Sequence, residues 1–498
     1  MITHLHLKNG SSPRQPKLTI ETPSSITIFV GPNNAGKSQA LRELFNFCFS
    51  GPLNAAGNVV VDGLTFSPGD PVTIRAEFEA MKLPPNPGEA TYPGHTFIKA
   101  DGQRLMVPEE NYIRAPTAPN QYTHEFAGWY LRYFVLNQDG ASRLGLGGAQ
   151  KRGDLKSPTS ELARLLTNDE KRSALRKIIL DAFGLYFAID AQVGDQLHVR
   201  FGLTPPPDER RFDDSALDYM RDARGMDAVS DGVKAFTGLL VQLYAGDPKI
   251  IVIDEPEAFL HPSLAFKLAK ELAKAASIEG KHVFAATHSP QFVMGAVLSG
   301  AKTNIVRLTY EDGIGTARLL HSDDMTTLMQ DPLLRSAGVL SGLFYNFVIV
   351  CEAHADRAFY QEINERLLTA DDSRGIPNAL FLNADNKQTI SKIVEPLRRL
   401  GIPCTSIIDL DIVKDGGMSG RVILGRAISR FPNISPTALG APAFSTRLEQ
   451  KLSTSNLPEV LTSFPARSTR QQKISFSTWL AMASSLCSAA RLRLGSLT

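Results

Sequence analysis

The order of apolar runs in the sequence predicts an α/β protein, and the length of the chain predicts about two or three domains. In this chain of 498 residues, strand-like runs alternate with helix-like runs, and polar residues follow several strands directly. One strand leads into a glycine-rich loop, and three others end in acidic residues. Because ligands gather at the carboxyl ends of strands in open α/β sheets, these features predict phosphate or metal sites.

Composition and charge restrict the class of protein. Hydrophobic residues make up 43% of the chain and charged residues 21%, as in ordinary globular proteins. The formal net charge is +2, so any contact with nucleic acid depends on a local basic patch. The four cysteines form no C-x-x-C pair, which disfavours a zinc module or a disulfide framework. Residues 1–12 do not show a basic segment followed by an apolar run, and no apolar run reaches membrane-helix length, so we expect a cytoplasmic protein without membrane contact.

The distribution of expected strands and helices divides the chain. Strands are expected at 2–7, 18–21, 26–30, 72–78, 130–136 and 197–201. The region from about 50 to 227 is mixed, with proline- and glycine-rich loops between its strand-like pieces. From 249 to 308, strands and helices alternate, and a second alternating set begins at Phe347. We therefore expect a domain boundary near 323–341.

The glycine-rich loop from Gly31 to Ser38 has the pattern G-x-x-x-x-G-K-[ST] between an apolar strand and the helix-like run 40–47. Its backbone N–H groups would wrap phosphates, Lys37 would supply a positive charge, and the Ser38 hydroxyl would bind Mg²⁺. An ordinary turn is the alternative, but chance rarely supplies the full motif in this context. The residues expected to contact a nucleotide are Gly31, Asn33, Asn34, Ala35, Gly36, Lys37, Ser38 and Gln39.

A second strand, 250–253, ends in the acidic pair Asp254 and Glu255. Asp254 would hold Mg²⁺ together with Ser38, and Glu255 would orient or deprotonate the attacking water. An acidic pair after a strand is common, but the helix expected after Pro262 and its position downstream of the glycine-rich loop favour the functional interpretation. The strand 282–286 is followed by His288, which would bring an imidazole near the γ-phosphate, although a lone histidine is more often structural.

A further acidic group is expected in the second alternating set. The apolar strand 347–351 ends at Glu352, Asp356 follows before a helix, and the strand 405–408 precedes Asp409 and Asp411. Carboxylates at one sheet edge repel one another unless a cation lies among them. We therefore predict a Mg²⁺ or Mn²⁺ site formed by Glu352, Asp409 and Asp411. The alternative, if Glu352 or the pair Asp409 and Asp411 is considered alone, is that these are solvated turn residues.

The first two thirds of the chain, about 1–320, resemble the ABC-type ATPases, in the branch of chromosome-maintenance and recombination ATPases. The resemblance implies ATP as cofactor, His288 as switch histidine and 229–234 as signature loop, although Asp231 stands where glycine is commoner. Ser230 and Gly232 would then reach the ATP of a partner protomer, which implies a dimer. It also suggests that 133–143, including Gln138 and Arg143, forms the loop that links the nucleotide to the inserted region.

The second acidic group resembles that of TOPRIM domains, with Glu352, Asp356, Asp409 and Asp411 at the motif positions and Ala353 where glycine is usual. The resemblance implies that these four acidic residues, Asp356 included, are catalytic. The order of the two regions, over about 1–430, resembles the OLD (overcoming lysogenization defect) family of ATP-dependent endonucleases. This resemblance implies an ATP-hydrolysing, metal-dependent DNA endonuclease that acts in bacterial anti-phage defence, with DNA and a protein of the same defence system as partners.

The expected architecture is thus an ABC-type P-loop ATPase domain with an inserted region, followed by a small TOPRIM-like βαβαβ domain. The expected limits are 1–325 for the ATPase, with 50–227 inserted, 342–432 for the TOPRIM-like domain and 433–498 for a C-terminal extension. Two other functions stay open: an ATP-switched dimeric sensor or scaffold with an inactive TOPRIM-like module, and a repair ATPase that loads on DNA without cutting. No tyrosine is singled out as the nucleophile that a topoisomerase needs.

Overall fold

The computed structural model divides the chain into two compact units, Met1–Asp331 and Pro332–Thr498. The structure describes residues 1–22, 26–52, 57–100, 103–140, 142–246, 248–311, 313–320, 322–336 and 338–408. The predicted domain limits of 1–325 and 342–432 stay predictions.

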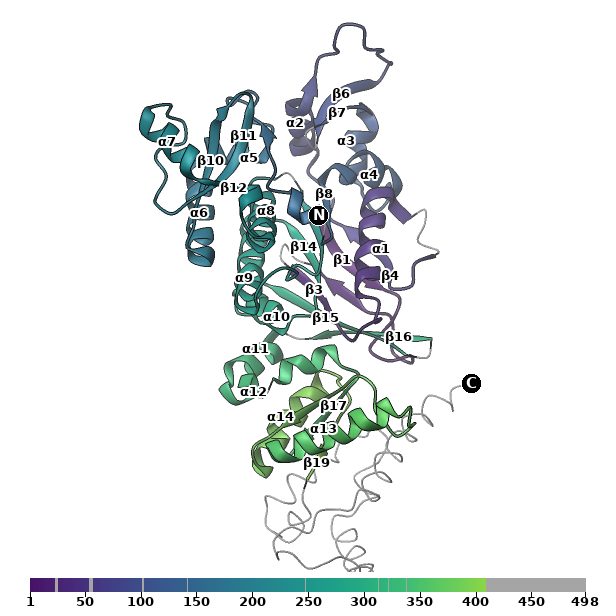
Figure 1. The fold of residues 1–498 in the computed structure, drawn as a ribbon. Helices are drawn as coiled ribbons and strands as arrows, with labels where there is room; N and C mark the ends of the chain where they lie inside the picture. Colours follow the sequence, from purple (N-terminus) through teal and green to yellow (C-terminus); the bar gives the residue numbers. More distant parts are fainter. Residues whose placement is uncertain are drawn as a thin grey trace, which may run out of the picture. The chain divides into compact units, whose positions relative to one another are not determined.

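The first unit is built on a six-stranded sheet in the order β16-β15-β3-β14-β13-β8 (Figure 1). These strands span Ile314–Leu320, Thr303–Glu311, Ile26–Val30, His282–Ala286, Ile250–Asp254 and Val135–Gln138, in that order. Neighbours from β15 to β8 are parallel, and β16 is an antiparallel edge strand. Strands β3 and β14 at the centre of the sheet are buried along their whole length because both faces of a parallel sheet are covered. The carboxyl ends of β3, β13 and β14 therefore meet at one sheet edge.

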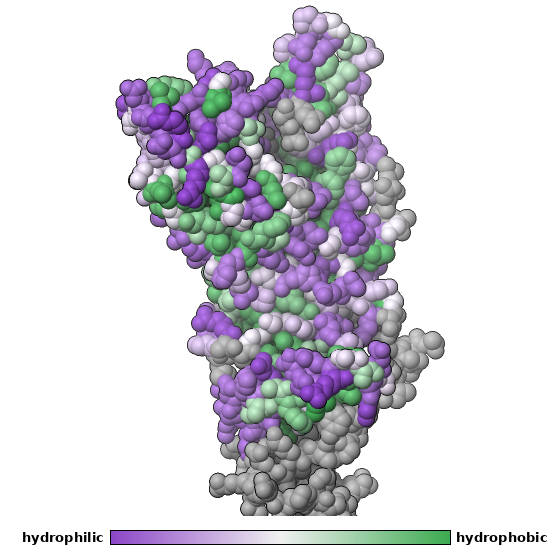
Figure 2. Space-filling model, viewed as in Figure 1, coloured by the Kyte–Doolittle hydropathy of each residue, from purple (hydrophilic) through white to green (hydrophobic). Residues whose placement is uncertain are grey.

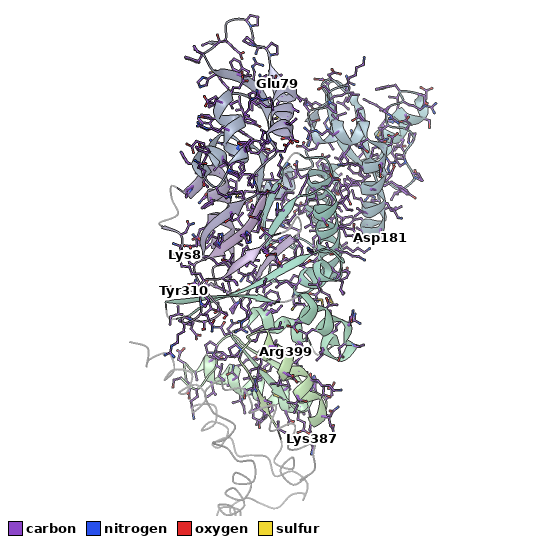
Figure 3. The ribbon with its side chains drawn as sticks, turned by 180° about the vertical axis from the view of Figure 1, so that it is seen from behind. Lys8, Glu79, Asp181, Tyr310, Lys387 and Arg399 are labelled. Atoms are coloured by element: carbon purple, nitrogen blue, oxygen red, sulfur yellow. The ribbon has the colours of Figure 1, made fainter. Side chains whose placement is uncertain are left out.

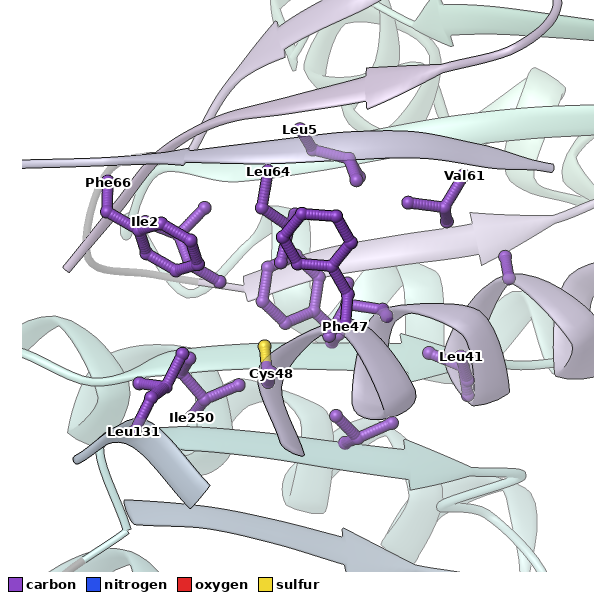
Figure 4. Packing of buried hydrophobic residues seen from close by; sticks show 14 of the residues in the cluster. Ile2, Leu5, Leu41, Phe47, Cys48, Val61, Leu64, Phe66, Leu131 and Ile250 are labelled. Carbon is purple, nitrogen blue, oxygen red and sulfur yellow. The ribbon is translucent and has the colours of Figure 1, made fainter. Parts of the chain in front are cut away.

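Helix α1, Lys37–Ser50, is packed between two sheets. It contacts β13 and β14 of the central sheet and β4 of a small antiparallel sheet in the order β2-β1-β4. The strands of this small sheet are β1 Ile2–Leu7, β2 Thr19–Glu21 and β4 Val61–Phe66. Figure 4 shows Phe47 and Cys48 of α1 near Leu64 of the small sheet and Ile250 of the central sheet, all within one buried cluster. The helix that follows the glycine-rich loop is thus fixed from both sides.

Helix α9, Pro262–Ile278, contacts β3 and β14 of the central sheet, and α10, Pro290–Val297, contacts β15. Helix α8, Asp231–Ala245, packs against α9. The start of α9 has the expected form, with His261 as N-cap and Pro262 at the first position. Leu268 and Leu272, four residues apart, are buried as one face of the helix requires. Lys267 Nζ lies 2.9 Å from Asp181 Oδ2, which joins α9 to the end of α6, Asp169–Phe183 (Figure 3).

The inserted region carries two antiparallel sheets, one in the order β5-β6-β7 and one in the order β10-β11-β12, with β9 paired to β11. Its strands are β5 Lys82–Leu83, β6 His95–Ala100, β7 Gln103–Pro108, β9 Gln150–Lys151, β10 Tyr186–Val193, β11 Gln196–Gly202 and β12 Arg224–Gly225. Its helices are α2 Pro71–Met81, α3 Glu109–Thr117, α4 Thr123–Trp129, η2 Leu131–Phe134, η3 Ser142–Gly145, α5 Glu161–Thr167, α6, α7 Asp214–Asp222 and η4 Met226–Ala228.

The expected strand at 72–78 is wrong, because this segment lies in helix α2. The Asp70 side chain accepts a hydrogen bond from the N–H of Thr73, which caps the helix, and Pro71 fits its first turn. Ile74 and Phe78 are buried four residues apart, as one helix face requires. The expected strand at 130–136 is only partly correct, since η2 precedes the short strand β8.

The second unit contains a parallel three-stranded sheet in the order β18-β17-β19. The strands span Ala379–Asn383, Phe347–Cys351 and Cys404–Ile407, in that order. The described helices of the two linking segments are α13 His354–Thr369 and α14 Lys387–Arg399. The short helix α12, Pro332–Ser336, and η5, Val339–Phe344, precede the sheet, and α11, Ser322–Gln330, is the last element of the first unit. This arrangement confirms the predicted βαβαβ order.

The visible surface mixes polar and apolar residues (Figure 2). Large apolar side chains with more than half of their surface exposed include Val72, Phe212 and Phe259. Among the helices that the structure describes, none is both long and apolar enough to cross a membrane.

Candidate active site

The loop between β3 and α1 has a backbone shape that its glycines permit. Gly31 has a φ of 146°, and a Cβ atom there would lie 2.1 Å from the carbonyl oxygen of Leu308 in β15. Gly36 has a φ of 90° at the N-cap of α1, and Asn34 has a φ of 61°. Positive φ values favour glycine and asparagine over other residues. The loop therefore leads into a helix N-terminus, which is a favourable place for a phosphate group.

Lys37 is held at the start of α1 by the loop itself. Its Nζ donates hydrogen bonds to the carbonyl oxygens of Gly31 and Pro32, at 2.9 and 2.7 Å, and the residue is only 5% exposed. Burial lowers the pKa of Lys37 to about 8, while the nearby carboxylates of Asp254 and Glu255, with Glu257, act against this change. The ammonium group thus lies within reach of acidic side chains from β13 and the turn after it. It is mostly charged at neutral pH.

Asp254 and Gln138 provide the structural test for a Mg²⁺ site. They end the neighbouring strands β13 and β8, where Ile253 pairs with Gln138. Within the described part of the chain, Asp254 Oδ1 and Gln138 Oε1 are buried and have no hydrogen-bond partner. Buried oxygen atoms of this kind are costly unless water or a cation binds them, and oxygen ligands suit Mg²⁺. These residues therefore fit the ion, with Ser38 at the start of α1 as the expected hydroxyl ligand.

Glu255 and His288 come together beyond the ends of β13 and β14. Their Oε1 and Nε2 atoms lie 3.8 Å apart. Glu255 has a φ of 50°, and its N–H donates to the carbonyl oxygen of Ala286 at 2.8 Å. Burial lowers the pKa of His288, the charge of Lys37 lowers it further, and the carboxylates of Glu255 and Asp254 oppose both effects. The imidazole is therefore mainly neutral at pH 7, beside an exposed glutamate.

Glu257 is a candidate that the sequence reasoning missed. Its Oε1 accepts a hydrogen bond from the backbone N–H of His288 at 2.8 Å. Its Oε2 is buried and, among the described residues, has no hydrogen-bond partner. Burial raises the pKa of Glu257, and hydrogen bonds from His288 and Thr287 oppose this increase. Glu257 thus holds the loop that carries His288. Its signal in the sequence is the second glutamate of the run Glu255-Pro256-Glu257.

The remaining residues of the phosphate loop have different surroundings. Asn33 and Asn34 are exposed, Ala35 is buried and Ser38 is partly exposed. Gln39 donates to Glu43 Oε1 at 2.9 Å, so it supports α1 from within the helix. The nucleotide contacts expected for these residues stay predictions.

The expected signature residues lie at the N-terminus of α8. Ser230 is the N-cap residue and is exposed, whereas Gly232 is buried. A Cβ atom on Gly232 would lie 2.8 Å from the carbonyl oxygen of Phe259. A glycine is therefore needed where α8 meets the chain that follows Glu257. Contact of Ser230 and Gly232 with a partner's nucleotide stays a prediction.

Of the acidic residues expected in the second unit, the structure describes Glu352 and Asp356. Glu352 directly follows β17, and Asp356 lies in the first turn of α13. Burial raises the pKa of the Cys351 thiol to about 12, and the Asp356 carboxylate adds to this increase, which places Asp356 near the end of β17. Cys351 pairs with Ile407 of β19, so the residues after both strands leave the same sheet edge.

Asp409 and Asp411 lie outside the described residues. In the described ranges, no group of three or more His, Cys, Asp or Glu side chains could hold a metal ion. The metal set of Glu352, Asp409 and Asp411 therefore stays a prediction.

Comparison with known families agrees with this geometry. Residues 26–294, more than half of the chain, match the model described as an AAA domain, putative AbiEii toxin, type IV toxin–antitoxin system. Residues 343–411 match the model described as an overcoming lysogenization defect protein-like TOPRIM domain. The chain is thus an AAA-type ATPase domain joined to a TOPRIM domain. It belongs to the family of the first model and has the ATPase–TOPRIM architecture of the OLD family.

Solved structures with some similarity include three heads of SMC proteins. The SMC head bound to the C-winged helix domain of ScpA has 13% identity and a TM-score of 0.37, covering 66% of this chain and 99% of that one. The SMC head domain from Thermotoga maritima has 14% identity and a TM-score of 0.31, covering 64% and 99%. The SMC head from Pyrococcus furiosus, with an extended coiled coil and bound to the C-terminal domain of ScpA, has 14% identity and a TM-score of 0.33, covering 66% and 98%.

No curated protein matches the chain. The family assignment therefore depends on the two family-model matches.

Proposed function

We propose that this protein hydrolyses ATP and that its nucleotide state gates a metal-dependent DNA endonuclease in the second unit. The observation that carries the proposal is the order of the two matched regions, an ATPase domain at 26–294 and an OLD-like TOPRIM domain at 343–411. The resemblance to the OLD family extends the proposal to bacterial defence against phage, with a further protein of the defence system as partner. A cytoplasmic location is part of the same proposal.

In the ATP site, each charged group has a position that supports its role. Lys37 would exchange its carbonyl partners for phosphate oxygens, since its Nζ already lies over the loop. Ser38 and Asp254 would hold Mg²⁺, which neutralises charge on the phosphates. Glu255 would orient the attacking water and take its proton, and His288 beside it would contact the γ-phosphate. This arrangement supports hydrolysis rather than binding alone.

A homodimer is part of the proposal. Ser230 begins α8, an element separate from the β3–α1 loop and the β13–β14 edge, and its side chain is exposed. An exposed N-cap serine at a helix N-terminus can donate its hydroxyl to a phosphate on another molecule. A second copy of this chain would supply Ser230 to the ATP bound at the first, as in the ATPases that the sequence resembles.

The nuclease half depends on the end of β17. Glu352 follows β17, which pairs with β19 in the sheet. Asp409 and Asp411 follow β19 in the sequence. Carboxylates gathered there would bind Mg²⁺ or Mn²⁺, which can activate water and stabilise the leaving oxygen of a DNA phosphate. Ala353 has φ −121° and ψ 163°, extended backbone that any residue adopts. Alanine in place of the usual glycine therefore causes no backbone strain, which favours an active site over an inactive module.

The test is cleavage of supercoiled and linear DNA by the full-length protein, with Mg²⁺ or Mn²⁺ and with or without ATP. We expect metal-dependent cleavage by the wild type and its loss in Glu352→Ala and Asp409→Ala, while ATP hydrolysis continues. Removal of the metal with a chelator should stop cleavage, and fresh Mg²⁺ should restore it.

The matched control is Glu362→Ala, an exposed glutamate on α13 that pairs with Arg366. It should cut DNA like the wild type. If the wild type hydrolyses ATP and never cuts DNA, the nuclease proposal is wrong, and the ATP-switched scaffold takes its place. Equal cleavage by Glu352→Ala and wild type would remove the acidic site from the proposal.

A further inference from the structure

Arg143 is a fully buried arginine next to the ATP site. It lies in η3 and is 0% exposed. Its Nε donates to the carbonyl oxygen of Asp139 at 3.0 Å, and its Nη1 donates to the carbonyl oxygen of Glu255 at 2.8 Å. Burying a guanidinium group is costly unless hydrogen bonds replace its water, so a buried arginine that binds backbone carbonyls has a specific structural role.

The Glu255 backbone is the more informative of the two partners. Its φ of 50° is a left-handed conformation that residues other than glycine rarely adopt and that persists only when the surroundings enforce it. Two hydrogen bonds hold it there. The Glu255 N–H donates to Ala286 at the end of β14, and the Glu255 carbonyl accepts from Arg143. Arg143 therefore holds one of the two peptide groups that determine where the Glu255 side chain points.

The segment that carries Arg143 is packed on α8. A Cβ atom on Gly238 of α8 would lie 2.6 Å from Cβ of Leu146 and 3.4 Å from the carbonyl oxygen of Arg143. This close approach needs glycine and fixes η3 against the middle of the helix. The N-terminus of the same helix carries Ser230. Arg143 thus joins the turn after β13 to the helix that begins with the signature residues.

We propose that Arg143 is a positioning residue for ATP hydrolysis, which fixes the left-handed backbone of Glu255 and couples it to α8. The inference rests on the ATP hydrolysis of the proposed function. Arg143 acts through the direction of the Glu255 carboxylate, so it sets the rate of the chemical step and leaves ATP binding nearly unchanged. Displacement of a catalytic group by about 1 Å can cost roughly 100-fold in rate.

Arg143→Lys in the full-length protein tests this assignment. Lysine keeps the charge but loses the planar fork that binds two carbonyl groups at once. We expect kcat to fall about 10- to 100-fold, with KM for ATP within about twofold of the wild type. The matched control is Arg164→Lys. Arg164 donates to the carbonyl oxygen of Ala245 at the other end of α8, and its replacement should leave kcat unchanged.

A double-mutant cycle separates positioning from a general loss of structure. In the Glu255→Gln background, single-turnover hydrolysis should be no slower with Arg143→Lys added, because the carboxylate that Arg143 positions is already gone. An equal fold loss in both backgrounds would overturn the proposal. A rise in KM with unchanged kcat would overturn it too.

Hydrogen exchange gives a readout that does not depend on ATP hydrolysis. We expect Arg143→Lys to speed exchange of the Glu255 amide, and Arg164→Lys to leave it at the wild-type rate. A wild type without ATPase activity would remove the proposed function, and this exchange measurement would still decide the role of Arg143. Unchanged exchange at Glu255 in Arg143→Lys would overturn the inference.

Discussion

The two candidate sites differ in how the protein holds their charges. In the ATP site, Lys37 and Arg143 are almost completely buried, and both donate to backbone carbonyl groups. In the second unit, Glu352 and Asp356 are partly exposed near the end of β17. Buried charges need partners that folding puts in place, whereas gathered carboxylates depend on a cation. Function at the first site is therefore tied to the packing around it, and function at the second is tied to its metal.

The largest effect is expected from the ATP site itself. Lys37→Ala removes the charge over the phosphate loop, and Glu255→Gln keeps the shape of the side chain but removes the base. We expect each to lower ATP hydrolysis by about 100- to 1,000-fold, with ATP binding retained only in Glu255→Gln. Phosphate release and nucleotide titration measure the two effects. Lys17→Ala, at an exposed ion pair with Asp62, is the control. Normal hydrolysis in both active-site variants would contradict the assignment.

The next prediction concerns the packing on which the ATP site depends. Glu43 of α1 is 2% exposed and accepts hydrogen bonds from the N–H groups of Val59, Val60 and Val61. Glu43→Ala leaves these donors without a partner, so we expect the free energy of unfolding of the first unit to fall by about 3 kcal/mol. Denaturant unfolding followed in that unit measures it. The control Glu79→Ala, at an exposed pair with Lys82 (Figure 3), should cost less than about 1 kcal/mol. Equal losses would contradict the comparison.

The smallest expected effect is on the pH dependence of ATP binding. The pKa of Lys37 is lowered to about 8, so its ammonium is charged below that pH and loses its proton as the pH rises through it. ATP affinity should therefore be constant near pH 7 and fall by about tenfold between pH 8 and 9.5. In the control variant Lys37→Arg, the guanidinium group stays charged throughout, so the ATP affinity of this variant, lower or not, should not change over this range. If the ATP affinity of the wild type does not change between about pH 8 and 9.5, the pKa of Lys37 lies outside this range.

Sequence reasoning predicted the parts of the site that local motifs define. The strand–loop–helix around Lys37 and the strand before Asp254 have strong local patterns, and the structure places both as expected. The segment 72–78 was predicted wrongly as a strand. Asp70 as N-cap and Pro71 at the first helical position are the local features that indicate helix α2 instead.

Other parts of the site depend on contacts between distant segments. Glu257 matters because β14 brings His288 to its carboxylate. The run Glu255-Pro256-Glu257 marks a second glutamate in the sequence, but it does not indicate this contact. Arg143 is important because its partner carbonyl belongs to Glu255, more than one hundred residues away in sequence. Burial of this kind arises from tertiary packing, which local propensity does not encode.

The close approach of Gly31 to Leu308 has a consequence for how such chains are assembled. Leu308 belongs to β15, and β15 continues through β16 and α11 to the point where the first unit ends. The strand that contacts the phosphate loop is thus separated in sequence from the end of the first unit only by β16 and α11. A module that follows α11 is therefore joined through β16 and α11 to a strand that contacts the phosphate loop, and any C-terminal module fused at this point has the same covalent link.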